Sequence, residues 1–303
     1  MIDFTNKVAI VTGAGSGLGR SHAIALAARG CKVIINDLGG SRTGEGASNT
    51  AAEKVVAEIE SKNGIAIADY TDVTNFEQVN QMVEKALSKW GRIDILINNA
   101  GILRDKTFAK ASMDDFQKVV DVHLMGTVNC TKAVWEPMRT QGYGRIVVTS
   151  SSSGLYGNFG QTNYGAAKMG VVGLMNTLRF EGAKYNINVN ALAPVAATRM
   201  TEDLIPAKEL STLSPEAVTA GVLYLVSENG PNGQILCAGA GCFAITRMVE
   251  TQGVFLGENP KPEMVESHWE QITGTKNQLD LDQGSSQTTK FLAMADQASS
   301  LNG

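Results

Sequence analysis

Short apolar runs alternate with longer amphipathic segments along most of the chain. A strand covered on both faces of a parallel sheet has no polar side, so runs of consecutive apolar residues predict buried strands. We expect such strands at residues 8–11, 33–36, 65–68, 93–97, 145–148, 187–192 and 234–237, the last of these closing the sheet. Apolar residues three or four apart predict helices after the first strand to about residue 29 and at 51–62, 76–90, 116–138, 164–185 and 215–227.

Strands and helices that alternate in this way predict an α/β fold with a doubly wound, mostly parallel sheet. We expect residues 1–245 to form a single domain that holds both the cofactor and the catalytic site. Residues 246–303 are expected to be a C-terminal extension that is partly helical, near 263–272. Its polar end is either partly disordered or packed at a subunit interface. The stretch 195–213 is expected to be a loop or lid.

A glycine-rich turn, Thr12–Gly19, follows the first predicted strand. Glycine allows a tight turn and a close approach of the backbone to a pyrophosphate, and the next helix presents unpaired N–H groups to it. Asp37 ends the second strand about twenty residues later, where a carboxylate can hold the ribose hydroxyls of adenosine. Strand, turn, helix, strand and acid together favour a dinucleotide site over a purely structural turn.

Tyr164 and Lys168 stand one helical turn apart in the predicted helix 164–185. Residues i and i+4 lie on one face of a helix, so the phenol and the ammonium point the same way. A nearby cation lowers the pKa of a tyrosine, and such a pair can pass a proton to or from an alcohol. Taken alone, this spacing is more typical of a half-buried tyrosine and a solvated lysine.

Several polar or glycine positions converge on one edge of the predicted sheet. Ligands of doubly wound sheets bind at the carboxyl ends of the strands. The positions that follow predicted strands there are Gly13, Asp37, Asn98, Ser151 and Val195. This convergence favours a functional reading of Tyr164 and Lys168. The segment Asn98–Gly101 is open to two readings, as a support of the sheet or as a border of the cofactor.

Composition and charge argue against several classes of protein. A net charge of −4 argues against a general nucleic-acid binder. No apolar stretch approaches the ~20 residues of a membrane span, and neither end of the sequence resembles a secretory signal or a peroxisomal address. We expect no metal site, and the spacing of the cysteines predicts small core residues in a reducing, cytoplasmic setting. These cysteines are Cys31, Cys130, Cys237 and Cys242.

Residues 4–245 resemble the short-chain dehydrogenase/reductase family in the glycine turn, the Asn98–Gly101 segment, Ser151 and the Tyr164–Lys168 pair. The resemblance implies a Rossmann fold and hydride transfer between a secondary alcohol and NAD, in a homodimer or homotetramer. The cofactor-binding residues it implies are Gly13, Ser16, Gly17, Leu18, Gly19, Asp37, Asp72, Val73, Asn99, Ala100, Gly101, Tyr164, Lys168, Pro194 and Thr198.

The same resemblance implies catalytic roles. Tyr164 is expected as general base in oxidation and general acid in reduction, Lys168 as the group that lowers its pKa and holds the nicotinamide ribose, and Ser151 as a hydrogen-bond partner of the substrate oxygen. His123 replaces the usual family Asn, so it is either the anchor of a water relay to Lys168 or a core histidine. Val195 replaces the glycine that usually follows the proline at 194.

Four segments resemble a narrower branch, the (3R)-hydroxyacyl-CoA dehydrogenase part of peroxisomal multifunctional enzyme type 2. They are residues 36–40, 101–105, 122–124 and 156–161. The branch implies a 3-hydroxyacyl-CoA substrate and its 3-ketoacyl product. The alternatives are a hydroxysteroid or other bulky-alcohol dehydrogenase and, in a different class, a NAD-binding sensor without turnover. Arg104 and Lys106 either border a CoA site or belong to a solvated loop.

Overall fold

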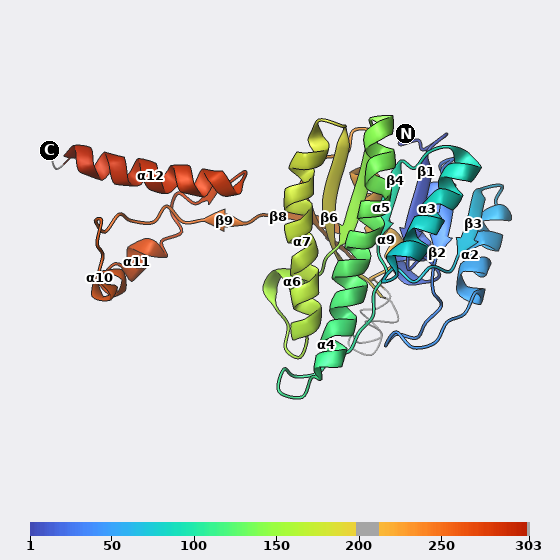
Figure 1. The fold of residues 1–303 in the computed structure, drawn as a ribbon, viewed down its shortest axis with the longest axis horizontal. Coiled ribbons are helices and arrows are strands. Elements are labelled where there is room, and N and C mark those ends of the chain that lie inside the picture. Colours follow the sequence, from blue (N-terminus) through green and yellow to red (C-terminus); the bar gives the residue numbers. More distant parts are fainter. Residues whose placement is uncertain (198–211, 302–303) are drawn as a thin grey trace. The chain divides into compact units, whose positions relative to one another are not determined.

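One sheet of eight strands, in the order β3-β2-β1-β4-β5-β6-β7-β8, organises most of the chain (Figure 1). The computed structural model describes residues 1–197 and 212–301. The chain divides into two units, Met1–Ile245 and Thr246–Gly303, each of which is described by itself. The strands of the sheet are β1 (Val8–Thr12), β2 (Lys32–Asn36), β3 (Ile65–Asp69), β4 (Ile95–Asn98), β5 (Gly144–Thr149), β6 (Ile187–Val195), β7 (Ile235–Gly239) and β8 (Cys242–Thr246).

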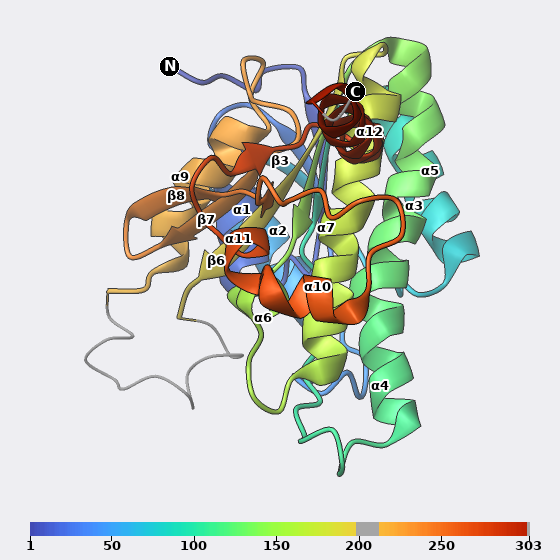
Figure 2. The same cartoon turned by 90° about the vertical axis from the view of Figure 1, so that its left-hand side faces the viewer.

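Helices connect these strands and cover both faces of the sheet. They are α1 (Gly17–Ala27), α2 (Thr50–Glu60), α3 (Phe76–Trp90), α4 (Met113–Val120), α5 (Gly126–Gln141), α6 (Ser152–Tyr156), α7 (Thr162–Ala183) and α9 (Pro215–Leu225), with a π-helical turn η1 (Asp121–Met125) between α4 and α5. In Figure 2, α1, α2 and α9 lie on one side of the sheet, and α3, α5 and α7 lie on the other. Each face has its own apolar core. Among the described helices, none is both long and apolar enough to cross a membrane.

The predicted doubly wound, parallel sheet is confirmed. Strands β1 to β7 pair in parallel, and β1, whose residues are all buried, lies between β2 and β4. The chain leaves β1 towards β2 and later returns to the opposite side at β4, so the strand order reverses there. A crevice opens at such a reversal, outside the carboxyl ends of the strands, and this is where ligands of these sheets bind.

The single helix predicted at 116–138 is interrupted in the structure. It runs as α4, η1 and α5 from Met113 to Gln141, and the wider turn of η1 changes the register of its buried face. Val119 and His123 are buried, whereas Phe116 and Val120 stay partly exposed. The π-turn places His123 inside the protein at the level of the crevice.

The expectation that the strand at 234–237 closes the sheet is wrong. Ala240 and Gly241 have φ angles of +49° and +75°, and this two-residue turn leads straight into the edge strand β8. Cys242 begins that strand and is exposed, so the prediction of a core position fails for it. Cys31 and Cys130 are buried as predicted.

The second unit contains more helix than the sequence predicted. It holds β9 (Val249–Glu250), β10 (Leu279–Asp280), α10 (Pro262–Ser267), α11 (Trp269–Ile272) and α12 (Gly284–Leu301). Lys290 of α12 donates hydrogen bonds to the Glu250 carboxylate, at 2.7 Å, and to the Thr251 carbonyl. These contacts tie α12 to the β9 segment within the second unit.

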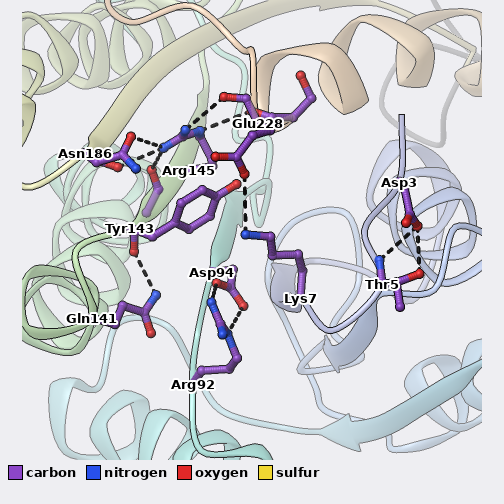
Figure 3. A network of polar contacts seen from close by, with 12 residues as sticks. Asp3, Thr5, Lys7, Arg92, Asp94, Gln141, Tyr143, Arg145, Asn186 and Glu228 are labelled. Carbon is purple, nitrogen blue, oxygen red and sulfur yellow. Dashed lines mark hydrogen bonds and ion pairs between the residues drawn. The ribbon is translucent and has the colours of Figure 1, made fainter. Parts of the chain in front are cut away.

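A buried arginine organises the edge of the sheet where β5 begins (Figure 3). Arg145 is 2% exposed, and its guanidinium donates to the carbonyl oxygens of Ser227, Asn186 and Glu228 at distances of 2.8 to 3.1 Å. Its guanidinium carbon also lies 4.3 Å from the centre of the Tyr143 ring. Backbone carbonyls and an aromatic face therefore stabilise this charge, and the cluster has a structural role at the edge opposite the crevice.

Candidate active site

A cavity of about 390 Å³ lies at the carboxyl ends of the strands and gathers most of the predicted site residues. The predicted residues that line it are Gly13, Ser16, Gly17, Leu18, Asp37, Asp72, Val73, Asn99, Ala100, Gly101, His123, Ser151, Tyr164, Lys168 and Pro194. Gly19 does not line the cavity and packs beneath the turn instead. Thr198 and most of the predicted lid lie outside the described residues.

The glycine turn after β1 forms one wall of the cavity. Gly13 has a φ angle of +61°, and a Cβ atom there would lie 2.8 Å from the Cα of Ala100. A Cβ atom on Gly19 would collide with the Gly13 carbonyl oxygen. Glycine at both positions thus allows α1 to start directly under the turn. The first turn of α1 carries no acidic residue, so its N-terminus can accept an anion.

Asp37 is held in place at the end of β2 by two backbone groups. The Gly15 N–H donates to one carboxylate oxygen and the Gly39 N–H to the other, both at 2.7 Å. The carboxylate lines the cavity beside the glycine turn. Each oxygen keeps a lone pair for a further donor, which is the arrangement that a ribose diol requires.

Asn99 both supports the sheet and borders the cavity. Its side-chain amide donates to the carbonyl oxygens of Thr12 and Gly13, each at 3.0 Å, while the Thr12 hydroxyl accepts from its backbone N–H. These bonds join β1 to β4 across the point where the strand order reverses. Asn99 also borders the cavity, so the structural support and the site border are one residue.

These features fit a dinucleotide such as NAD. The glycine turn and the N-terminus of α1 would hold the pyrophosphate, and Asp37 would hold the adenosine ribose. Asp72 and Val73 line the same end of the cavity, and the Val73 carbonyl is fixed by a hydrogen bond from Asn129 at 2.9 Å. The chain therefore supplies the donors and the acceptor for this ligand at one edge of the sheet.

Ser151, Tyr164 and Lys168 meet at the other part of the cavity. Ser151 caps the short helix α6, and its hydroxyl lies close enough to the Tyr164 phenol to lower the pKa of Tyr164. The Lys168 ammonium lies 5.5 Å from the centre of the Tyr164 ring and donates to the Thr149 carbonyl at 2.5 Å. The end of β5 and the first turns of α7 thus place a hydroxyl, a phenol and an ammonium together, as the sequence predicted.

Burial has the largest effect on the pKa values of Lys168 and Tyr164. Lys168 is 4% exposed, and loss of hydration lowers its pKa to about 7. Burial also raises the pKa of Tyr164; the hydrogen bond with Ser151 lowers this pKa and the charge of Asp105 raises it. The sequence led us to expect a lowered tyrosine pKa, but the buried lysine does not offset the loss of hydration around the phenol.

His123 lies against Tyr164 but bonds to the backbone. The two rings meet edge to face with centres 5.0 Å apart. Nε2 of His123 lies 3.0 Å from the Ile102 nitrogen and 2.7 Å from the Ile102 oxygen, and Nδ1 is buried without a partner among the described residues. Burial and the charge of Lys168 hold the pKa of His123 well below its usual value, so the ring is neutral.

Arg104 and Lys106 do not line the cavity. Both donate to the carboxylate of Asp115, at 2.8 and 2.9 Å, and together they lower the pKa of Asp115 to about 2. Arg104 also donates to the Thr43 carbonyl at 3.0 Å. Their position outside the cavity favours the reading as loop residues, and their ion pairs join this loop to the first turn of α4.

The sequence did not point to several residues that line the cavity. Arg42 and Lys118 are two of them, and they bring positive charge to it. The Thr149 carbonyl that accepts from Lys168 is a backbone group, so no side-chain pattern could have revealed it. Gln161 also lines the cavity, and it stands at the N-cap of α7, three residues before Tyr164. The sequence marked it only as part of the segment 156–161 that resembles the narrower branch.

Comparisons with known proteins agree with this geometry. The sequence pattern of the short chain dehydrogenase family matches residues 7–209. A peroxisomal hydratase-dehydrogenase-epimerase of Saccharomyces cerevisiae is 48% identical over 276 residues, which are 90% of this chain and 30% of the yeast protein. The chain therefore spans about a third of the length of that relative.

Solved structures show the same fold. Full-length peroxisomal multifunctional enzyme type 2 from Drosophila melanogaster aligns with a TM-score of 0.83 and 35% identity, covering 98% of this chain and 50% of that one. A 7α-hydroxysteroid dehydrogenase complexed with NADH and 7-oxo glycochenodeoxycholic acid aligns with a TM-score of 0.71 and 29% identity, covering 79% of this chain and 95% of that one.

Replacing Lys168 with Met should stabilise the ligand-free protein at neutral pH. The pKa of Lys168 is lowered to about 7 on folding, so the unfolded chain binds the proton more readily. The free energy of unfolding of the wild type should therefore rise as the pH increases from about 7 towards ~10, the usual pKa of lysine. Lys168→Met should lack this rise and be more stable at neutral pH by about 1–3 kcal/mol, as is found when buried charges are replaced by apolar groups.

Urea unfolding at several pH values measures this effect. Lys54→Met is the matched control, because Lys54 is exposed on α2 and should change neither the stability nor its pH dependence appreciably. A Lys168→Met protein that is less stable than the wild type and keeps the same pH slope would contradict the assignment of a destabilising buried charge.

Proposed function

The chain belongs to the short-chain dehydrogenase family, and from that premise we propose that it interconverts a (3R)-hydroxyacyl-CoA and a 3-ketoacyl-CoA with NAD. One observation carries the proposal. Tyr164, Lys168 and Ser151 line the same cavity as the Gly13 turn and Asp37. A proton-transfer group and a dinucleotide site thus face one another, as the oxidation of an alcohol requires.

Bound NAD would supply the hydride acceptor, and the residues of the chain would orient the alcohol and move its proton. The Ser151 hydroxyl would hydrogen-bond the substrate oxygen, and Tyr164 would take the hydroxyl proton in oxidation and return it in reduction. Lys168 would stabilise the phenolate and hold the nicotinamide ribose. Since burial raises the pKa of Tyr164, the phenol is protonated at neutral pH, and oxidation should become faster as the pH rises.

His123 would support this group without ionising. Its ring packs on Gly101, where a Cβ atom would lie 3.0 Å from Nδ1, and it holds the Ile102 backbone. The unpartnered Nδ1 is the atom that a water relay to Lys168 would use. We assign His123 a positioning role in either case, because both functions need a neutral ring at this place.

The choice of an acyl-CoA rests on the narrower resemblance and on charge. The yeast and Drosophila relatives are named as a hydratase-dehydrogenase-epimerase and a multifunctional enzyme of the peroxisome. In the described part of the cavity, Arg42 and Lys118 are the basic residues besides Lys168, and they suit a polyanionic substrate. They replace Arg104 and Lys106 as candidates for the nucleotide of CoA.

A steroid alcohol is the second candidate substrate, and the similarity to the 7α-hydroxysteroid dehydrogenase favours it. A NAD-binding sensor without turnover is less well supported, because the serine, tyrosine and lysine are all in place. A homodimer or homotetramer and a cytoplasmic location also stay proposals. The relatives named as peroxisomal make the location a question for cell fractionation.

The enzyme should oxidise (3R)-hydroxyacyl-CoA and leave the S isomer nearly untouched, because a fixed alcohol oxygen presents only one face of the carbon to the cofactor. NADH fluorescence with both isomers measures this. Tyr164→Phe should lower turnover by roughly 10²–10⁴-fold, the usual contribution of an acid/base group, while NAD still binds. If the enzyme oxidises a steroid alcohol but neither CoA isomer, the thioester assignment is wrong and only the assignment as a dehydrogenase stands.

The wild type should prefer NAD to NADP, because the Asp37 carboxylate accepts from ribose hydroxyls and repels a 2′-phosphate. Asp37→Asn should reduce this preference by removing the charge while an acceptor for the Gly15 N–H remains. Steady-state kinetics with both cofactors at matched concentrations measure the ratio, and Asp72→Asn serves as the control at the same end of the cavity. Equal use of the two cofactors by the wild type would show that the assignment is wrong.

A further inference from the structure

Two segments that the proposed chemistry does not use meet beside Tyr164. Gln161 belongs to one and Asp105 to the other, and the Gln161 side-chain amide donates to an Asp105 carboxylate oxygen at 2.6 Å. The amide oxygen of Gln161 accepts from the Ser153 hydroxyl at 2.8 Å and from the Asn158 amide at 3.0 Å. Gln161 is only 8% exposed, so its side chain is held by three partners in a largely buried position.

The same residue sets the start of the helix that carries Tyr164. Gln161 is the N-cap position of α7, and its carbonyl accepts from the Gly165 N–H at 2.7 Å. It also forms a backbone bridge with Lys106. Next to it, the buried Asn163 donates to the Arg104 carbonyl at 3.2 Å and accepts from the Tyr164 N–H at 2.8 Å. The first turn of α7 is thus fastened to the segment 104–106.

We propose that Gln161 and Asp105 are positioning residues for Tyr164, joining the loop at 105 to the start of α7 and placing a negative charge near the phenol. The inference rests on the proposed function, since it concerns the group that moves the proton. It adds to that function a control over the orientation of the phenol and over the pH at which it loses its proton.

Asp105 reaches the Tyr164 helix through Gln161, whose amide donates to its carboxylate and which is the N-cap residue of α7. Three other polar or titratable side chains face Tyr164. Lys168 faces the ring from α7, His123 from η1, and the Ser151 hydroxyl from the end of β5. The neighbours of Asp105 in sequence, Arg104 and Lys106, both bond to Asp115. The charge of Asp105 contributes to the raised pKa of Tyr164, which agrees with this arrangement.

Two variants and their combination distinguish the effect of the Asp105 charge from the effect of the Gln161–Asp105 hydrogen bond. Asp105→Asn removes the charge but keeps an acceptor for the Gln161 amide. Gln161→Glu sets a second carboxylate against Asp105 and breaks the hydrogen bond. In the double variant Asp105→Asn/Gln161→Glu the new amide at 105 can donate to the new carboxylate at 161, so the bond returns with its direction reversed.

The first measurement is the ultraviolet titration of the Tyr164 phenol in the ligand-free protein, taken as the difference from Tyr164→Phe. Asp105→Asn should lower the pKa of Tyr164 by roughly half a unit at low salt and by less at high salt, because Asp105 is exposed and its charge is screened. Asp114→Asn, an exposed acid at the start of α4, should leave the titration unchanged. This readout needs neither cofactor nor turnover, so it stands even if the proposed substrate is wrong.

The second measurement is kcat for any alcohol that the wild type oxidises. Gln161→Glu should lose about tenfold in kcat, and the double variant should regain most of it, as coupled neighbours do. The KM for NAD should stay within about twofold in both, since other residues hold the dinucleotide. A Tyr164 titration unmoved by Asp105→Asn, or a double variant as slow as Gln161→Glu, would overturn the proposal. A wild-type protein that oxidises none of the alcohols tested would instead refute the proposed function.

Discussion

The Lys168 ammonium is buried with no carboxylate partner among the described residues, and the site depends on this constraint. Its described hydrogen-bond partner is the Thr149 carbonyl, so neutral dipoles rather than a counter-ion hold the charge. The Ser150 hydroxyl in turn donates to the Lys168 carbonyl at 2.8 Å, which locks the end of β5 against α7. A desolvated cation with a pKa of about 7 is costly in the folded protein and is therefore expected at a functional site.

The sheet explains why this costly group can be kept. At the edge where β5 begins, Arg145 is surrounded by carbonyl oxygens and an aromatic ring, and Asp94 binds both Arg92 and the Val8 N–H. At the carboxyl edge, three of the ionisable groups, Tyr164, Lys168 and His123, have pKa values moved by burial. The charges that stabilise the fold thus lie at one end of the parallel strands, and the groups proposed to move a proton lie at the other.

Much of this arrangement follows from local sequence signals. The glycine turn, Asp37 and the Tyr164–Lys168 spacing each depend on short-range geometry, and the parallel order of the strands brings them together. The π-helical turn at His123 could not be predicted from the sequence, because it inserts one residue into the helix without altering the pattern of residue types nearby. The ion pair of Arg104 did not follow from the sequence either. Its partner Asp115 is eleven residues away across a loop, and the sequence does not fix such a contact.

The central claim is that Ser151 and Tyr164 face the alcohol that is oxidised at the dinucleotide site. A crystal structure of Tyr164→Phe with NAD and a (3R)-hydroxyacyl-CoA, which traps the substrate before turnover, tests it most directly. The account predicts the substrate hydroxyl about 2.6–3.2 Å from the Ser151 oxygen and directed at the ring of residue 164, with the nicotinamide against the carbinol carbon. A hydroxyl directed away from both residues, with the acyl chain bound outside this cavity, would contradict it.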